Sequence, residues 1–122
     1  MAKFNVDRGG MVLDSPVSGT FVEGTALALT DNGWAVIPGK YSLARYVTAG
    51  YHSNRDDVKL LKIARLVIGP MVATTDQVWG TPAILDMVVP SGGKLVTTTV
   101  ASEAVGYVVG YSGGLYTIQF FK

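Results

Sequence analysis

The last part of this chain, from Pro82 to the C-terminus, is an almost unbroken succession of β-forming segments separated by short links that contain glycine. Valine, isoleucine, threonine and tyrosine dominate these segments, and such residues fit a pleated, half-buried surface. The glycines of the links supply the positive φ of tight hairpin turns without steric strain. We therefore predict antiparallel strands over residues 83–89, 94–100, 104–111 and 115–121, with turns at Gly92-Gly93 and Gly113-Gly114.

The middle of the chain carries further strand signals. Asp31-Asn32-Gly33 is the strongest local hairpin signal in the sequence, because Asn-Gly favours a type I′ turn. Around it we predict short strands at residues 20–22, 26–30, 34–37 and 41–48, an exposed polar loop at residues 50–57, and a loop or single turn at residues 74–80.

Residues 58–68 are the ambiguous segment. Apolar residues from Val58 to Ile68 share one strand face, interrupted by Lys62, yet no glycine or proline breaks the run, which leaves a helix open. We favour a strand, because Gly69-Pro70 ends the run and its neighbours are β-forming. Together, about seven to ten short strands at close spacing predict an all-β fold, a small single-domain sandwich or barrel of antiparallel strands.

A chain of 122 residues is most simply one domain. We divide it into an extended N-terminal arm, residues 1–15, and a single β domain, residues 16–122. The arm is polar, contains the Gly9-Gly10 break and has few apolar anchors. Such a segment is either disordered or adds a strand to a neighbouring sheet, and we expect the second.

Charged residues make up only 16% of the sequence, well below the roughly 25% of average soluble proteins. This scarcity suggests that copies of the chain or a partner cover part of its surface. The net charge of +1 creates no field that would gather nucleic acid. No apolar stretch approaches the roughly 18 residues of a membrane span, and the N-terminus lacks the apolar core of a signal peptide. We therefore expect neither nucleic acid nor a membrane as a partner.

None of the sequence patterns that would indicate catalysis is complete. The run from Gly110 to Gly114 fits the Gly-x-Ser-x-Gly pattern of a nucleophile elbow, but a strand follows it where a helix is needed, and the only histidine, His52, lies upstream. A hairpin turn explains this run better. One histidine and no cysteine leave no multi-histidine or thiolate metal site, and no carboxylate pair or phosphate loop is apparent. We predict no enzyme, no cofactor, and no catalytic or metal-binding residues.

Three C-terminal segments together resemble a known family. They are Gly80–Asp86, Gly93–Thr99 and Val105–Tyr111, and they are similar to segments of the small head decoration, or cement, proteins of tailed bacteriophages. The resemblance implies a structural protein that binds the major capsid protein on the outer surface of the phage head. It also implies a homotrimer that bridges capsomers, stabilises the shell against packaged DNA, and is synthesised in the cytoplasm of the bacterial host.

Contact residues follow as expectations from this resemblance and from the composition. We expect Phe4, Val6 and Arg8 of the arm to contact the capsid, and Trp34, Tyr51 and Trp79 to lie between subunits. Two alternatives remain open. One is another phage structural subunit, of the head closure, tail tube or fibre base. The other is a carbohydrate-binding β module that uses a platform of aromatic side chains: Trp34, Tyr41, Tyr46, Tyr51, Trp79, Tyr107, Tyr111 and Tyr116.

Overall fold

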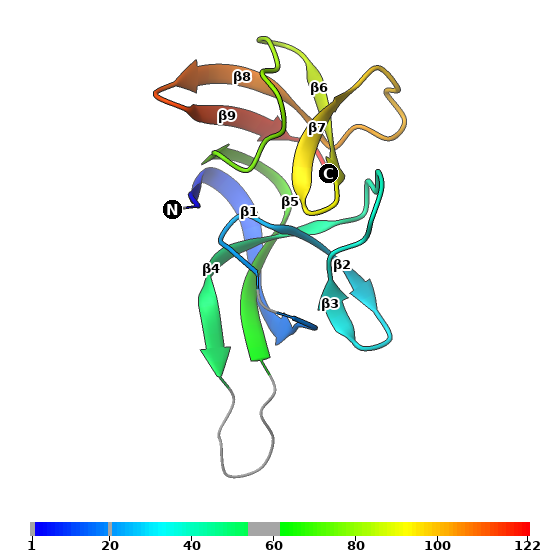
Figure 1. Cartoon of the computed structure of the whole chain (residues 1–122). Coiled ribbons are helices and arrows are strands. Elements are labelled where there is room, and N and C mark those ends of the chain that lie inside the picture. Colours follow the sequence, from blue (N-terminus) through cyan, green and yellow to red (C-terminus); the bar gives the residue numbers. More distant parts are fainter. Residues whose placement is uncertain (1, 20, 54–61) are drawn as a thin grey trace.

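A computed structural model of the chain describes residues 2–19, 21–53 and 62–122. These residues contain no helix and form nine strands that pair antiparallel into one curled sheet (Figure 1). The strands are β1 (Phe4–Pro16), β2 (Ala26–Thr30), β3 (Gly33–Ala35), β4 (Arg45–Ser53), β5 (Lys62–Thr75), β6 (Met87–Ser91), β7 (Lys94–Thr98), β8 (Gly106–Ser112) and β9 (Leu115–Phe120). The predicted all-β, single-domain fold is confirmed.

The long, bent strand β5 is the element on which the sheet is built. One of its edges carries β1 along almost its whole length, from Phe4 opposite Thr75 to Pro16 opposite Ile63. Its other edge is shared: β4 pairs with the first part, as far as Val67, and β9 pairs with residues 71–75. The bend between these parts lies at Gly69-Pro70, which no neighbouring strand pairs. Pro70 therefore interrupts no ladder, although proline has no N–H to donate.

Two groups of strands extend from β5, and each curls until it nearly closes. The first runs β5-β4-β2-β3, and a parallel bridge from Val17 to Trp34 connects β3 with the segment that follows β1. The second runs β5-β9-β8-β6-β7, and a parallel bridge from Val78 to Leu95 connects β7 with the segment that follows β5. The chain thus curls on both sides of its central strand, as Figure 1 shows.

Each curl encloses apolar side chains. The small core lies in the first group and consists of Val17, Leu27, Val47, Ala64 and Leu66. The large core lies mainly in the second group and is built around fully buried Phe120, Ile118 and Val108, with Phe4, Tyr46 and other residues packed on them. Alternation produces this arrangement: β9 is buried at every second residue, at Tyr116, Ile118 and Phe120, as expected for a strand with one face in the core.

The N-terminal arm is a strand of this chain's own sheet, not of a neighbouring one. Phe4 is 3% exposed and belongs to the large core. The preceding residue is held as well: the Lys3 backbone N–H donates to Asp76 Oδ1 at 2.9 Å, and the Thr75 hydroxyl donates to the Lys3 carbonyl at 2.9 Å. The expected division into an arm of residues 1–15 and a β domain of residues 16–122 is therefore not a division of the sheet.

The local predictions fared unevenly. The three glycine-turn hairpins, β2–β3, β6–β7 and β8–β9, are confirmed. The β2–β3 turn is not of type I′, because Asn32 lacks the positive φ that this type requires. The ambiguous segment is a strand from Lys62 onward; residues 58–61 lie outside the described residues. It continues through Gly69-Pro70 to Thr75, so the predicted end at residue 68 was wrong, and the loop predicted at residues 74–80 begins only at residue 76. The strand β4 begins later than predicted and extends to Ser53, into the predicted polar loop, of which residues 54–57 lie outside the described residues.

One predicted strand is a turn instead, and a second predicted strand begins with a turn. Phe21 and Val22 are not in a strand, and a turn begins at Val22, whose carbonyl accepts from the Thr25 hydroxyl at 2.8 Å; Thr20 lies outside the described residues. Residues 83–86 also form a turn, in which the Ala83 N–H donates to Asp86 Oδ2 at 2.9 Å. The strand therefore starts only at Met87.

Candidate functional site

The described residues show no arrangement typical of an active site. They contain no group of three histidine, cysteine or acidic residues that could hold a metal ion. The Gly-x-Ser-x-Gly run at residues 110–114 is the tip of the β8–β9 hairpin, where Ser112 pairs with Leu115. This confirms the hairpin interpretation of that run. The candidate features are therefore binding surfaces.

The most prominent binding feature is the outer edge of β1, meaning the edge that faces away from β5. Within the described ranges, β1 pairs with β5 alone. On this strand Met11, Val12 and Leu13 are 70%, 63% and 42% exposed. A long edge strand with unpaired backbone groups can accept a further strand, and natural proteins usually block such edges with charges or proline. Here three apolar side chains lie along it.

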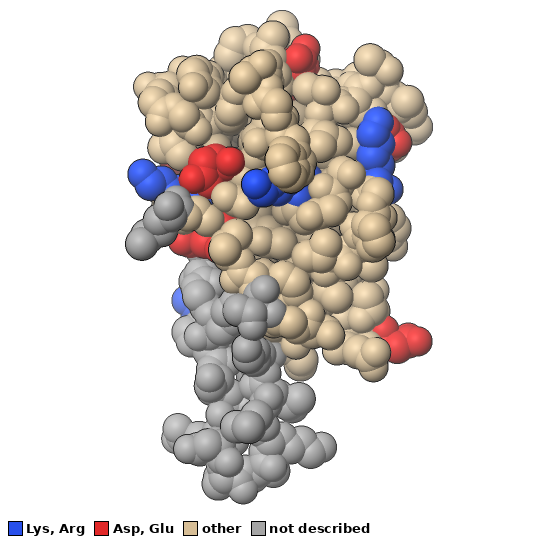
Figure 2. Space-filling view, viewed as in Figure 1, with Lys and Arg blue, Asp and Glu red and all other residues tan. Residues whose placement is uncertain are grey.

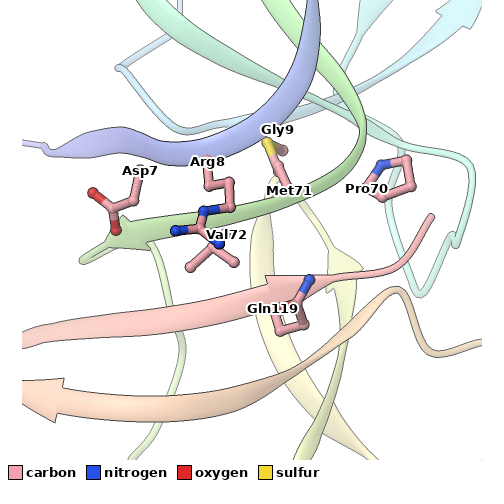
Figure 3. Close-up of a pocket in the computed structure, with 7 residues that line it drawn as sticks. All are labelled: Asp7, Arg8, Gly9, Pro70, Met71, Val72 and Gln119. Atoms are coloured by element: carbon pink, nitrogen blue, oxygen red, sulfur yellow. The ribbon is translucent and has the colours of Figure 1, made fainter.

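A pocket of about 450 Å³ lies on the outer face of the sheet, over β5 and between β1 and β9. The side of β1 contributes Asp7, Arg8 and Gly9, and the opposite side is Gln119 of β9. The floor is the part of β5 at the bend, Pro70, Met71 and Val72. Figure 3 shows the Arg8 side chain extending from β1 over Val72, with Gln119 beyond it.

The bend of both strands creates this pocket. Gly9 and Gly10 both have φ of +80°, and the β1–β5 register shifts on each side of Arg8 and Gly9. A Cβ built on Gly9 would lie 2.7 Å from the Pro70 carbonyl oxygen, so only glycine fits there. Because such shifts re-aim side chains next to them, the bulge turns the neighbouring Arg8 toward the outer face.

Polar groups of the pocket differ in how well they are paired. The Asp7 carboxylate accepts from the Thr74 hydroxyl at 2.9 Å, and Gln119 Nε2 donates to the Phe120 carbonyl at 3.3 Å. Arg8 is exposed and forms no ion pair with any carboxylate of the described residues. It is thus the polar side chain of the pocket with the most unused hydrogen-bonding capacity.

The three expected capsid contacts are not equivalent in the structure. Phe4 is buried and stacks on Tyr46 with ring centroids 5.8 Å apart. Val6 is half-buried and packs against the large core. Only Arg8 presents its side chain to a possible partner. Met11, Val12 and Leu13 were not among the expected contacts, although their sequence carried a signal: a strand face buries alternate residues, so three consecutive apolar residues cannot all be buried by one face.

The expected subunit contacts also differ. Trp34 is half-buried against the small core, and its Nε1 donates to Ser15 Oγ at 3.0 Å. Trp79 is 57% exposed, with Lys94 Nζ 4.3 Å from the ring centroid. The side chain of Tyr51 lies outside the described residues. Trp79 is therefore available to a partner, and Trp34 has a role within the chain.

The aromatic platform expected for carbohydrate binding is divided between core and surface. Tyr46 and Tyr116 are 3% and 8% exposed. Tyr111 is exposed, with its ring centroid 4.6 Å from that of Tyr116. Stacking on sugar needs exposed ring faces, so the buried rings cannot take part.

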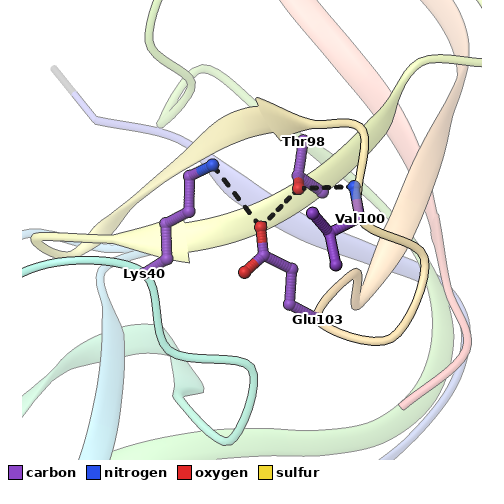
Figure 4. Close-up of polar contacts among 4 residues, drawn as sticks. All are labelled: Lys40, Thr98, Val100 and Glu103. Atoms are coloured by element: carbon purple, nitrogen blue, oxygen red, sulfur yellow. Dashed lines mark hydrogen bonds and ion pairs between the residues drawn. The ribbon is translucent and has the colours of Figure 1, made fainter.

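One ion pair of the described residues connects two loops. On the face shown in Figure 2 charged groups are few and separated by broad areas of other residues. Lys40 Nζ lies 3.4 Å from Glu103 Oε1, which also accepts from the Thr98 hydroxyl (Figure 4). The Thr98 hydrogen bond and the Lys40 ammonium lower the pKa of Glu103. The pair joins the segment before β4 to the loop after β7 and is no candidate acid–base site.

Comparisons with protein-family models, curated proteins and solved structures found no match to this chain. The part of the chain that the structure describes has no helix of the length and apolarity needed to cross a membrane.

Proposed function

We propose that this chain is a decoration protein of a tailed-phage capsid, and that the outer edge of β1 docks on the major capsid protein. In this role, copies of the chain, assembled as trimers, bind the outer surface of the head and bridge neighbouring capsomers. They thereby stabilise the shell against the pressure of packaged DNA. The observation that carries the proposal is the unpaired edge of β1 with Met11, Val12 and Leu13 exposed along it.

The proposed docking is the addition of a strand to the sheet. An extended segment of a shell protein can pair with this edge through main-chain hydrogen bonds, and the exposed apolar side chains add buried area. No deep pocket is needed. Many identical copies on one head then make a modest affinity of each contact sufficient.

The strand β1 is held within the sheet, and this favours docking by β1 in place over docking by a flexible arm. Because Phe4 and Lys3 hold β1 in place, docking requires no ordering of a loose segment. Pre-organisation of this kind lowers the entropic penalty of binding. Exposed Trp79, on the segment that follows β5, offers a second surface for contact between copies.

A charge placed on the edge tests the proposal. Val12→Lys should reduce binding to emptied phage heads by tenfold or more, because a lysine on an edge strand opposes pairing with a further strand. Val100→Lys is the matched control, since Val100 is also exposed but lies in the loop after β7. Binding is measured by co-sedimentation of purified protein with heads emptied of DNA, and both variants should unfold at the wild-type temperature.

Two results would contradict the proposal. One is that wild-type protein does not sediment with heads at any concentration tested. The other is that Val12→Lys and Val100→Lys bind equally well. Native mass spectrometry separates the remaining virion alternative, since a ring of five, six or twelve subunits indicates a closure, tube or fibre-base protein.

A further inference from the structure

We infer that the pocket between β1, β5 and β9 binds the carboxylate of an acidic side chain, carried by an extended segment of the partner that docks on β1. Arg8 is the residue that binds this carboxylate. The inference rests on the proposed docking at β1 and specifies the chemistry of the partner segment.

Position is the first argument. Arg8 lies on the same strand as Met11, Val12 and Leu13, three residues before Met11. A segment that pairs with this edge and continues along it therefore runs beside Arg8, with β1 between the segment and the pocket. Since side chains of an extended segment alternate, one of them can turn over β1 into the pocket.

Unbalanced charge is the second argument. A guanidinium offers up to five N–H donors in a fixed planar fork that matches a carboxylate. Arg8 has no carboxylate within ion-pair distance among the described residues, whereas Arg65, on β5, holds Asp14 of β1 at 3.2 Å. Charge-assisted pairs of this kind are stronger than neutral hydrogen bonds, so Arg8 selects a carboxylate over an amide.

The shape of the pocket is the third argument. Its floor is apolar and consists of Pro70, Met71 and Val72, and Figure 3 shows Val72 next to the Arg8 side chain. A side chain that turns over β1 and lies on this floor needs an apolar stem between its backbone and its carboxylate. A glutamate supplies such a stem. Gln119 at the far side offers an amide to the same ligand. The pocket therefore fits a glutamate better than an aspartate.

Asp7 makes the inference sharply testable, because it places a negative charge in the same pocket. Its hydrogen bond from Thr74 holds the carboxylate but does not neutralise it. An acidic ligand is thus attracted by Arg8 and repelled by Asp7. Neutralising Arg8 and neutralising Asp7 should therefore move the affinity for such a ligand in opposite directions.

The probe is a short N-acetylated peptide amide of alternating valine and glutamate, compared with its valine–glutamine and valine–lysine counterparts. Binding is followed by NMR through the Val72 methyl groups and the Gln119 side-chain amide. We expect the glutamate peptide to bind most tightly. Arg8→Gln should weaken it about tenfold or more, and Asp7→Asn should strengthen it severalfold. Lys94→Gln, which removes a positive charge from β7, is the control and should change little.

The outcomes separate this inference from the proposed function. The inference is overturned if the three peptides bind alike, or if Asp7→Asn weakens the glutamate peptide. If heads bind wild-type protein and Arg8→Gln equally, the shell is held by β1 without this pocket, and again the inference fails. If the glutamate peptide binds through Arg8 but heads do not bind the protein, capsid decoration fails and carboxylate recognition stands.

Discussion

Phe4 of β1 stacks on Tyr46 of β4, with ring centroids 5.8 Å apart and planes inclined by only 8°. Tyr46 in turn meets Phe120 of β9, 4.7 Å away. These three rings connect the first strand of the chain with both strands that share the other edge of β5. The strand proposed for docking is thus fixed in the large core at its N-terminal end and exposed at Met11, Val12 and Leu13.

Removing the Phe4 ring should destabilise the whole protein. Phe4→Ala creates a cavity beside Tyr46 and should lower the free energy of unfolding by about 3–5 kcal/mol. Phe121→Ala is the comparison, because Phe121 is 43% exposed; its loss should stay below about 1 kcal/mol. Urea denaturation of the two variants and the wild-type protein measures both free energies of unfolding. An unchanged stability of Phe4→Ala would mean that β1 does not contribute to the core.

The hydroxyl of Tyr46 is buried with no hydrogen-bond partner among the described residues, and burial raises the pKa of this phenol. An unpaired buried polar group is unfavourable, so Tyr46→Phe should raise the free energy of unfolding by about 1 kcal/mol. Tyr107→Phe, at a half-buried position on β8, should be nearly neutral. A destabilised Tyr46→Phe would show that the hydroxyl has a partner in solution, such as a bound water.

The bend of β1 should tolerate no side chain at Gly9. Gly9→Ala brings a Cβ to 2.7 Å from the Pro70 carbonyl oxygen at a φ of +80°, and should destabilise the fold by about 2 kcal/mol or more. Gly110→Ala is matched, since a Cβ there meets Thr117 at an ordinary 3.5 Å. Thermal unfolding of the two variants compares them directly. Equal melting temperatures would contradict the claim that the bend of β1 requires glycine at position 9.

Attachment of the N-terminus should depend on pH through Asp76. Burial alone would raise the pKa of Asp76, but hydrogen bonds from the Gln77 amide and the Lys3 N–H outweigh it, and the pKa is lowered. A carboxyl group whose pKa is lower in the folded state stabilises above its unfolded pKa of about 4. That stabilisation is lost as the pH falls through the lowered pKa.

Amide exchange at Lys3 measures this attachment. In wild-type protein, protection of Lys3 should fall as the pH is lowered below about 4. In Asp76→Asn, protection should be weaker and flat over the same range. Asp31→Asn, in the β2–β3 turn, should keep the wild-type profile. The same acid-dependent loss in Asp76→Asn would assign the effect to another group.

Local signals in the sequence were sufficient for the hairpins. Gly33, Gly92-Gly93 and Gly113-Gly114 all have positive φ at the ends of their hairpins, a conformation that glycine adopts without steric strain. The strand boundaries that were predicted wrongly depend on pairing between segments far apart in the sequence. Pro70 suggested the end of a strand, yet it falls in the gap where β5 changes partner from β4 to β9. Asp86 converted the β-forming run at residues 83–86 into a turn through its own side chain.

The candidate surface was only partly predictable for the same reason. The arm was expected to lie apart from the β domain because of its polar residues and its Gly9-Gly10 break. Instead Phe4 anchors it through a contact with Tyr46, more than forty positions away. Arg8 could be singled out as a charged residue of this segment. Its pocket could not, because the pocket exists only where the bends of β1 and β5 coincide beside Gln119.

Hydrogen exchange of the protein with and without emptied phage heads tests docking at β1 most directly. The account predicts that peptides covering residues 10–16 gain protection on heads, while peptides covering the β2–β3 hairpin do not. Protection confined to other strands, with the exchange of residues 10–16 unchanged on fully occupied heads, would contradict it.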